Sequence, residues 1–168
     1  MNALAVLAAV HAVGADLDQA IAALEGHHAV GGRGKPVNLT LDGKAVTLLD
    51  ESYNANPVSM NAAIGVLGGW SGGPKIAVLG EMRELGGEAE ALHLALVPAL
   101  VAAGIDRVHA AGAMMKPVLD QLPEKMRGHW AQTAAELVDI VAAQLEDGAI
   151  IMAKGSNASR VSAFVEGL

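Results

Sequence analysis

The sequence predicts an α/β domain with a mainly parallel sheet, a β-hairpin at its start and a short helical segment before it. Three observations support this fold class. Short apolar runs that end in or near glycine alternate with longer helical patterns, which is typical of βαβ units whose helices cover both faces of a sheet and so make three layers. An Asp-Gly pair between two alternating segments predicts the hairpin. The first residues are apolar on nearly every side, which predicts the separate helical segment.

The N-terminal segment is predicted to hold two short helices and a loop. Residues 2–13 form a helical pattern without a polar face, as expected for a helix buried in something larger. Asp16 is a candidate N-cap for a second helix over residues 17–24. The glycine-rich stretch 26–36 is predicted to be a loop and a domain boundary.

The elements of the α/β domain then alternate along the chain. Residues 37–41 and 44–49 flank Asp42-Gly43, a pair that suits a tight type I′ turn. The predicted strands after the hairpin are 75–80, 107–112, 149–155 and, with a weaker pattern, 128–131. The predicted helices are 58–67, 88–103, 114–122, 134–145 and 159–166.

The composition argues against several classes of protein. The chain has 168 residues and no cysteine, so it is long enough to bury a core and has no disulfide or thiolate chemistry. Its formal net charge is -7 and no basic run occurs, so no nucleic-acid partner is expected. Hydrophobic residues make up 52% and the mean hydropathy is +0.38, but no apolar run approaches the roughly 18 residues that span a membrane. The histidines at 27, 28 and 109 lack metal-ligand spacing with carboxylates, so they are predicted to be ordinary loop or strand residues.

The most unusual segment is residues 50–57, at the end of a predicted strand, where ligands bind in parallel α/β sheets. It holds two carboxylates, two amides and the single tyrosine, which can bind ribose hydroxyls, read a base edge and stack on a base. An ordinary polar turn that caps the next helix explains the same residues, and composition alone favours this turn. Pro57 is predicted to start that helix.

Two further loops follow strands. Residues 80–87 are charged, and we expect this loop to be solvated and the nearby His93 to be packed or solvated. Residues 154–160 combine Lys, Ser and Arg with free backbone N–H groups, so an anion site and a plain connection are equally good interpretations. Neither this turn nor residues 31–35 match the GxxxxGK[ST] pattern of a phosphate-binding loop.

Taken together, these segments resemble the Mur ligase family. Residues 50–57 (DESYNANP), 75–86 (KIAVLGEMRELG) and 152–160 (MAKGSNASR) are similar, in this order and spacing, to three motifs of the family member that adds D-alanyl-D-alanine. The resemblance covers essentially the whole chain. It implies a Rossmann-like ligase domain at residues 35–168, preceded at residues 1–34 by the C-terminal helical tail of a central ATPase domain and its linker.

The resemblance also implies an activity. The whole enzyme would be a monomeric, cytoplasmic bacterial ligase of peptidoglycan precursor synthesis. It would use ATP and Mg²⁺ to convert a carboxylate of UDP-N-acetylmuramoyl-tripeptide into an acyl phosphate, which the amine of D-alanyl-D-alanine attacks. The implied nucleotide-binding residues are Arg33, Glu51, Tyr53, Asn54 and Asn56. The residues implied to lie toward the dipeptide and the transferred phosphate are Lys154, Ser156 and Arg160.

The sequence also departs from the family pattern. Glu51 and Glu81 stand where the family usually has Asp, and residues 157–159 differ from the family's usual run. The family's phosphate loop, modified lysine, Mg²⁺ ligands and UDP-binding domain would all lie upstream of this sequence. We therefore expect the chain alone to be inactive, with no certain catalytic residue, no metal site and no tightly bound ATP.

Two other functions remain open. A freestanding, non-enzymatic α/β module could bind a nucleotide or a small anion with the same fold. A related ligase for another substrate, such as a folylpolyglutamate synthetase, is a third interpretation, and the string at residues 53–56 argues against it.

Overall fold

A computed structural model describes residues 2–25 and 31–168, and the chain divides into two compact units after residue 30. The first unit consists of α1 (Asn2–Ala12) and α2 (Leu17–Glu25). The Asp16 carboxylate accepts the Gln19 N–H at 3.0 Å, which confirms the predicted N-cap. Leu4 and Val13 are 72% and 79% exposed, so this unit leaves much of its apolar surface uncovered. The described helices are all too short or too polar to cross a membrane.

The second unit contains a six-stranded sheet and six α-helices among its described residues. In chain order its elements are β1 (Lys35–Leu41), β2 (Lys44–Glu51), α3 (Pro57–Gly68), β3 (Lys75–Leu79), α4 (Ala89–Leu94), α5 (Leu96–Ala102), β4 (Arg107–Ala111), α6 (Lys116–Gln121), β5 (Arg127–Ala131), α7 (Val138–Ala142), β6 (Ile150–Lys154) and α8 (Ser162–Gly167). The mainly parallel α/β fold that the sequence predicts is therefore confirmed.

The hairpin forms as predicted, with one correction at its start. Asp42 and Gly43 have φ angles of 49° and 79°, the positive values that a type I′ turn requires. Strand β1 begins earlier than expected, because Lys35 and Pro36 pair with Asp50 and Leu49 of β2 instead of lying in the loop. The predicted loop at residues 26–30 and the histidines at 27 and 28 lie outside the described residues.

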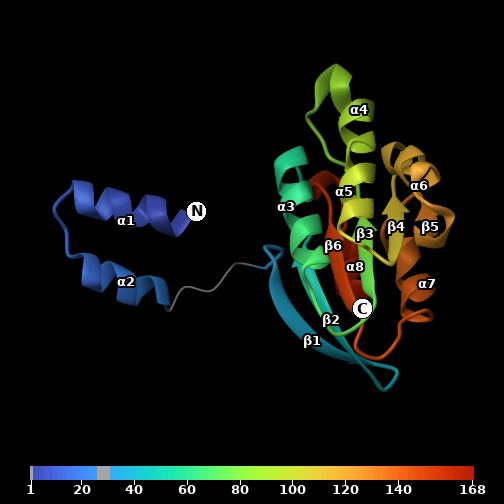
Figure 1. Cartoon of the computed structure of the whole chain (residues 1–168), viewed down its shortest axis with the longest axis horizontal. Helices are drawn as coiled ribbons and strands as arrows, with labels where there is room; N and C mark the ends of the chain where they lie inside the picture. Colours follow the sequence, from blue (N-terminus) through green and yellow to red (C-terminus); the bar gives the residue numbers. More distant parts are fainter. Residues whose placement is uncertain (1, 26–30) are drawn as a thin grey trace. The chain divides into compact units, whose positions relative to one another are not determined.

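The sheet has the order β1-β2-β6-β3-β4-β5. Only β1 runs antiparallel to its neighbour, and the other four pairings are parallel. Strand β6 is inserted between β2 and β3 (Figure 1), and all five of its residues are buried. The carboxyl ends of β2, β6, β3, β4 and β5 therefore lie along one edge of the sheet, where the sequence places its polar motifs.

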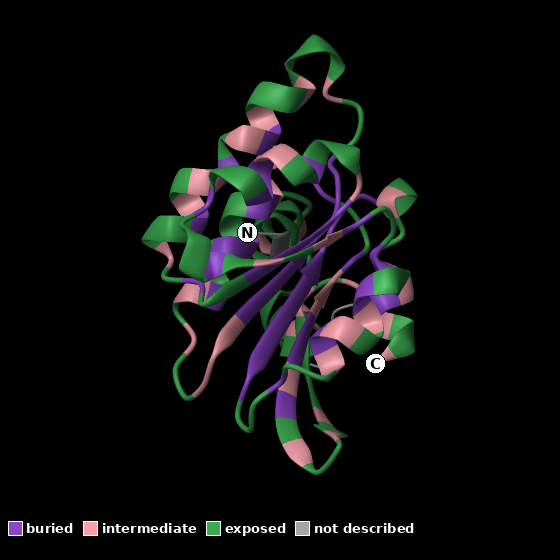
Figure 2. Cartoon of the chain, turned by 90° about the vertical axis from the view of Figure 1, so that its right-hand side faces the viewer, coloured by how far each residue is buried: buried purple, intermediate pink, exposed green. Residues whose placement is uncertain are grey.

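Helices cover both faces of the sheet, which gives the predicted three layers. On one face α3, α4, α5 and α6 pack on the strands through fully buried side chains such as Met60, Leu67 and Leu100. On the other face α7 and α8 bury Val141 and Phe164. Figure 2 shows the inner strands buried between these helices, while β1 at the edge of the sheet remains largely exposed. The site at the strand ends is thus supported by a rigid, doubly covered sheet.

Four of the predicted helices differ from the observed ones in length. Residues 88–103 form two helices rather than one, and α4 ends at Leu94. Pro98 explains this break, because it has no N–H for the Leu94 carbonyl and its ring clashes with that group. Helices α6, α7 and α8 are shorter than expected, and each follows a 3₁₀ turn.

Candidate functional site

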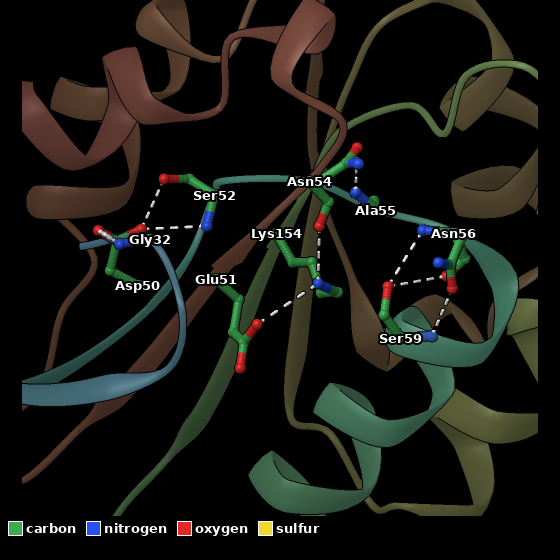
Figure 3. Close-up of polar contacts among 9 residues, drawn as sticks. All are labelled: Gly32, Asp50, Glu51, Ser52, Asn54, Ala55, Asn56, Ser59 and Lys154. Atoms are coloured by element: carbon green, nitrogen blue, oxygen red, sulfur yellow. Dashed lines mark hydrogen bonds and ion pairs between the residues drawn. The ribbon is translucent and has the colours of Figure 1, made fainter. Parts of the chain in front are cut away.

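The loop after β2 is organised by the carboxylate of Asp50. Its Oδ1 accepts from the backbone N–H of Ser52 at 3.0 Å and from the Ser52 hydroxyl at 2.6 Å (Figure 3). Its Oδ2 accepts the Gly32 N–H at 3.0 Å, and the Tyr53 N–H donates to the Gly32 carbonyl at 3.1 Å. These bonds hold the segment before β1 against the exit of β2.

The two amides of this loop use their oxygens for local structure. The Asn56 Oδ1 accepts the Ser59 N–H at 2.8 Å, and the Ser59 hydroxyl accepts the Asn56 N–H at 3.0 Å, which is a capping box for α3. The Asn54 Oδ1 accepts the Ala55 N–H at 2.8 Å. Pro57 occupies the first turn of α3, as predicted. The polar-turn interpretation is therefore correct for these oxygens, while both Nδ2 groups lack a hydrogen bond to any described residue.

A charged pair joins the exits of β2 and β6. Lys154 is only 1% exposed; its ammonium lies 3.5 Å from Glu51 Oε2 and donates to the Asn54 carbonyl at 3.0 Å (Figure 3). Burial lowers the pKa of Lys154, and the nearby Glu51 carboxylate counteracts part of this shift. The pair fixes Oε2 of Glu51, and within the described structure its Oε1 accepts no hydrogen bond.

A cavity of about 320 Å³ opens beside this pair. The Arg33 guanidinium lies over the Tyr53 ring at 4.3 Å from the ring centre, and Tyr53 is 50% exposed. We call this space the hairpin-side cavity; its lining includes Arg33, Glu51, Tyr53, Asn54, Asn56 and Lys154. It therefore combines an aromatic face, a guanidinium, free amide donors and a carboxylate acceptor.

A second cavity of about 670 Å³ lies at the exits of β3, β4, β5 and β6. Its polar lining includes Glu81, Arg83, Thr133, Ser159 and Arg160, and much of the remaining wall is alanine. We call it the wide cavity. It places two guanidinium groups and one carboxylate around a space whose walls carry small methyl groups.

The family model described as the Mur ligase, glutamate ligase domain matches residues 32–157, which is three quarters of the chain. The chain belongs to the Mur ligase family. This match covers the lining of both cavities except for the end of the loop after β6 and Ala163 of α8.

Sequence relatives of this Mur ligase chain include two curated ligases. The UDP-N-acetylmuramoyl-tripeptide–D-alanyl-D-alanine ligase of Escherichia coli strain K12 is 38% identical over 168 residues, which cover 99% of the chain and 36% of that protein. The ligase of the same name from Mycobacterium tuberculosis strain H37Rv is 34% identical over 190 residues, covering 99% of the chain and 37% of that protein. The chain thus spans about a third of the length of these relatives.

Solved structures show the same fold. The D-alanyl-D-alanyl ligase of Acinetobacter baumannii has a TM-score of 0.81 and 28% identity, over 98% of this chain and 35% of that one. A MurF ligase from Thermotoga maritima, solved in complex with ADP, has a TM-score of 0.77 and 23% identity, over 96% of this chain and 35% of that one. The second likeness concerns the fold alone.

The structure divides the residues that the sequence assigns to the dipeptide. Lys154 lies with Glu51 in the hairpin-side cavity, whereas Arg160 lines the wide cavity. Ser156 is buried; its hydroxyl accepts the Ser159 N–H at 3.3 Å, and its own N–H donates to the Glu81 carbonyl at 2.9 Å. In this Mur ligase domain the five residues implied to bind the nucleotide all line the hairpin-side cavity. The three residues implied to lie toward the dipeptide and the phosphate do not line one common cavity.

The prediction of a solvated loop at residues 80–87 is wrong at the start of the loop, whereas residues 83, 84, 86 and 87 are exposed. Glu81 and Met82 are only 8% and 3% exposed. The Glu81 Oε1 accepts the Met114 N–H at 3.0 Å, and its Oε2 lies 2.9 Å from an Arg83 nitrogen. Arg83 lies in the same loop, whereas Met114 follows β4. The contact with Met114 depends on the fold, so the local sequence could indicate only that the charges follow a strand. His93 was expected to be packed or solvated, and the structure shows that it is packed.

Metal ligands are not grouped in the described part of this Mur ligase chain. Among residues 2–25 and 31–168, no three or more His, Asp or Glu side chains lie close enough together to hold an ion. We therefore assign no step that passes through Mg²⁺ to these residues.

Proposed function

We propose that this chain is the C-terminal part of the ATP-dependent ligase that adds D-alanyl-D-alanine to UDP-N-acetylmuramoyl-tripeptide in peptidoglycan precursor synthesis. Residues 1–34 would be the tail of the central ATPase domain with its linker, and residues 35–168 the C-terminal domain of a monomeric, cytoplasmic bacterial enzyme. The likeness to D-alanyl-D-alanine ligases over 99% of the chain supports this proposal. The observation that carries it is the Glu51–Lys154 pair beside the Arg33–Tyr53 face.

We infer that the hairpin-side cavity receives the nucleoside part of ATP. The Oε1 of Glu51 would accept from a ribose hydroxyl, because Lys154 engages only the other carboxylate oxygen. The exposed faces of Tyr53 and Arg33 can stack on a base. The Nδ2 groups of Asn54 and Asn56 remain as donors. Lys154 would therefore act on the nucleotide side and not on the dipeptide.

The wide cavity would then receive the dipeptide. Arg83 and Arg160 can bind a carboxylate, and its alanine walls fit methyl side chains. The dipeptide's amine would attack the acyl phosphate carbonyl, form the peptide bond and release phosphate and a proton. Ser156 would shape the loop after β6 through its backbone and hydroxyl bonds rather than touch the substrate.

A freestanding module that binds a nucleotide or an anion is the second candidate, because the same cavities could serve it. The gene distinguishes the two functions. A reading frame that continues upstream into a GxxGK[ST] loop favours the ligase, whereas a start at Met1 without upstream coding sequence favours the module.

The isolated chain is expected to bind ATP and D-alanyl-D-alanine weakly and to catalyse no turnover. The physical reason is that phosphoryl transfer needs a phosphate-cradling loop and metal ligands. The sequence has no GxxxxGK[ST] pattern, and among the described residues no three or more possible metal ligands are grouped. Calorimetric titration of both ligands into the chain, and then into the chain joined to its upstream domain, measures the difference. Tight ATP binding to the chain alone, or ATP hydrolysis that depends on both substrates, would overturn the assignment of most nucleotide contacts to the upstream domain.

Replacing Glu51 by Gln is expected to raise the KM for ATP of the full-length ligase about 10-fold, since a charged acceptor for the ribose is lost. The KM for D-alanyl-D-alanine should remain near that of the parent enzyme. Glu90→Gln is the matched control, because Glu90 is exposed on α4 and lines neither cavity. An unchanged KM for ATP in Glu51→Gln would exclude the proposed ribose contact.

A further inference from the structure

His93 is a buried histidine that belongs to neither set of predicted site residues. It lies on α4 and is 1% exposed. Its Nδ1 lies 2.6 Å from the Ala89 carbonyl, and its Nε2 lies 2.9 Å from the Met82 backbone nitrogen. A carbonyl can only accept and a backbone N–H can only donate, so Nδ1 carries the proton and Nε2 accepts. Both ring nitrogens are therefore used, in one defined tautomer.

The Nε2 atom of His93 accepts from the backbone of the loop that forms part of the wide cavity. Met82 is 3% exposed, so its N–H has no access to bulk water and depends on His93. The residues on either side of Met82 are Glu81 and Arg83, which both line the wide cavity. The position of the Met82 backbone thus determines the backbone positions from which the Glu81 and Arg83 side chains extend.

Two other contacts hold the same loop from different directions. The Glu81 carbonyl accepts the Ser156 N–H at 2.9 Å from the exit of β6. The Glu81 Oε1 accepts the Met114 N–H at 3.0 Å from the turn after β4. Together with His93 on α4, these bonds hold Glu81 and Met82 at three points, and of these three contacts only that of His93 is made by a side chain outside the loop.

We propose that His93 is a positioning residue for the wide cavity. By accepting the Met82 N–H, it holds Glu81 and Arg83 where they can meet the charged ends of a small zwitterionic peptide. The identity of this ligand rests on the proposed function, whereas the positioning of the loop does not. His93 touches no reacting atom.

Two substitutions separate this role from simple packing. His93→Gln keeps an amide oxygen that can accept from Met82 and an amide nitrogen that can donate to Ala89. His93→Leu fills similar space but leaves the buried Met82 N–H without an acceptor. In the full-length ligase we expect His93→Leu to raise the KM for D-alanyl-D-alanine about 10-fold, with the KM for ATP nearly unchanged. His93→Gln should recover most of this loss.

The 168-residue chain provides a readout that does not depend on ligase activity. In ¹⁵N-labelled chain, the Met82 amide should exchange with D₂O at least about 10-fold faster in His93→Leu than in the parent or in His93→Gln, while amides of β6 keep their rates. Equal Met82 exchange in all three proteins would overturn the positioning role. Faster Met82 exchange without any change in the dipeptide KM of an active ligase would overturn its link to the wide cavity. A full-length protein without ligase activity would reject the proposed function and leave the exchange result to decide the role of His93.

Discussion

Gly155→Ala is expected to lower the free energy of unfolding of the α/β unit by about 2–3 kcal/mol. The added Cβ would lie 2.5 Å from the Ser159 Oγ and 2.5 Å from the Val161 Cγ2, with the Gly80 Cα at 3.1 Å. Val161 is fully buried, and the Ser159 hydroxyl donates to the Ser156 carbonyl at 2.6 Å, so neither side chain can move without losing contacts. A Cβ on Gly80 would meet the same two side chains, so the packing at this point requires glycine at both positions.

Urea unfolding measures this loss, and a shifted midpoint with an unchanged slope would identify it as a change in stability. Gly65→Ala is the matched control. Gly65 lies inside α3, and a Cβ there meets nothing within 4 Å. The control should therefore gain about 0.5–1 kcal/mol from helix propensity. A Gly155→Ala midpoint equal to that of the parent would contradict the close approach at the exit of β6.

Acidification is expected to destabilise the α/β unit through His109, whose side chain is 1% exposed in β4. Burial, followed by the nearby charges of His129 and Arg107, lowers the pKa of His109 from 6.5 to about 4. Above pH 6.5 the imidazole is neutral in both the folded and the unfolded state, so it does not change the free energy of unfolding. As the pH falls from 6.5 toward 4, the unfolded chain takes up the proton first, so the free energy of unfolding falls by about 3 kcal/mol in total.

His109→Asn isolates this contribution from the titration of the carboxylates. The Nδ1 of His109 accepts the His129 N–H at 3.1 Å, and an asparagine oxygen can take the same place without titrating. The free energies of unfolding of the parent and the variant should therefore converge, or cross, as the pH falls from 7 to 4. Two parallel pH profiles would show that His109 has the same pKa in the folded and unfolded states.

Local patterns in the sequence were enough to find every strand of the sheet, because each strand is a short apolar run between turn residues. The order of the strands could not be found in this way. The position of β6 depends on pairing with β2 and β3, which precede it by about a hundred and about seventy-five residues. The break between α4 and α5 was predictable in principle, since Pro98 within a helical pattern indicates it.

The sequence identified most residues of the candidate site, but it did not show which of them lie together in the same cavity. Residues 50–57 serve as the polar turn that composition favours, and the groups that this turn does not use border the hairpin-side cavity. Lys154 is the last residue of β6 and belongs to the same short motif as Arg160, so the sequence suggested a shared role. The structure separates them, because β6 pairs with β2 and brings Lys154 to Glu51. Glu81 and Met82 were missed as buried residues, since their partners lie far away in the sequence or on the next helix.

The central position of β6 has a consequence for how this domain is made. Strands β1 and β2 form one part of the sheet, β3, β4 and β5 form another, and the two parts are hydrogen-bonded to each other only through β6. A ribosome synthesises residues 150–154 after all the other strands, so the earlier strands emerge as two ribbons with unpaired edges facing each other. The sheet can close only when these five residues have left the exit tunnel. Until then both edges are open to pairing with other chains, and the two halves of the ligand-binding edge are not yet aligned.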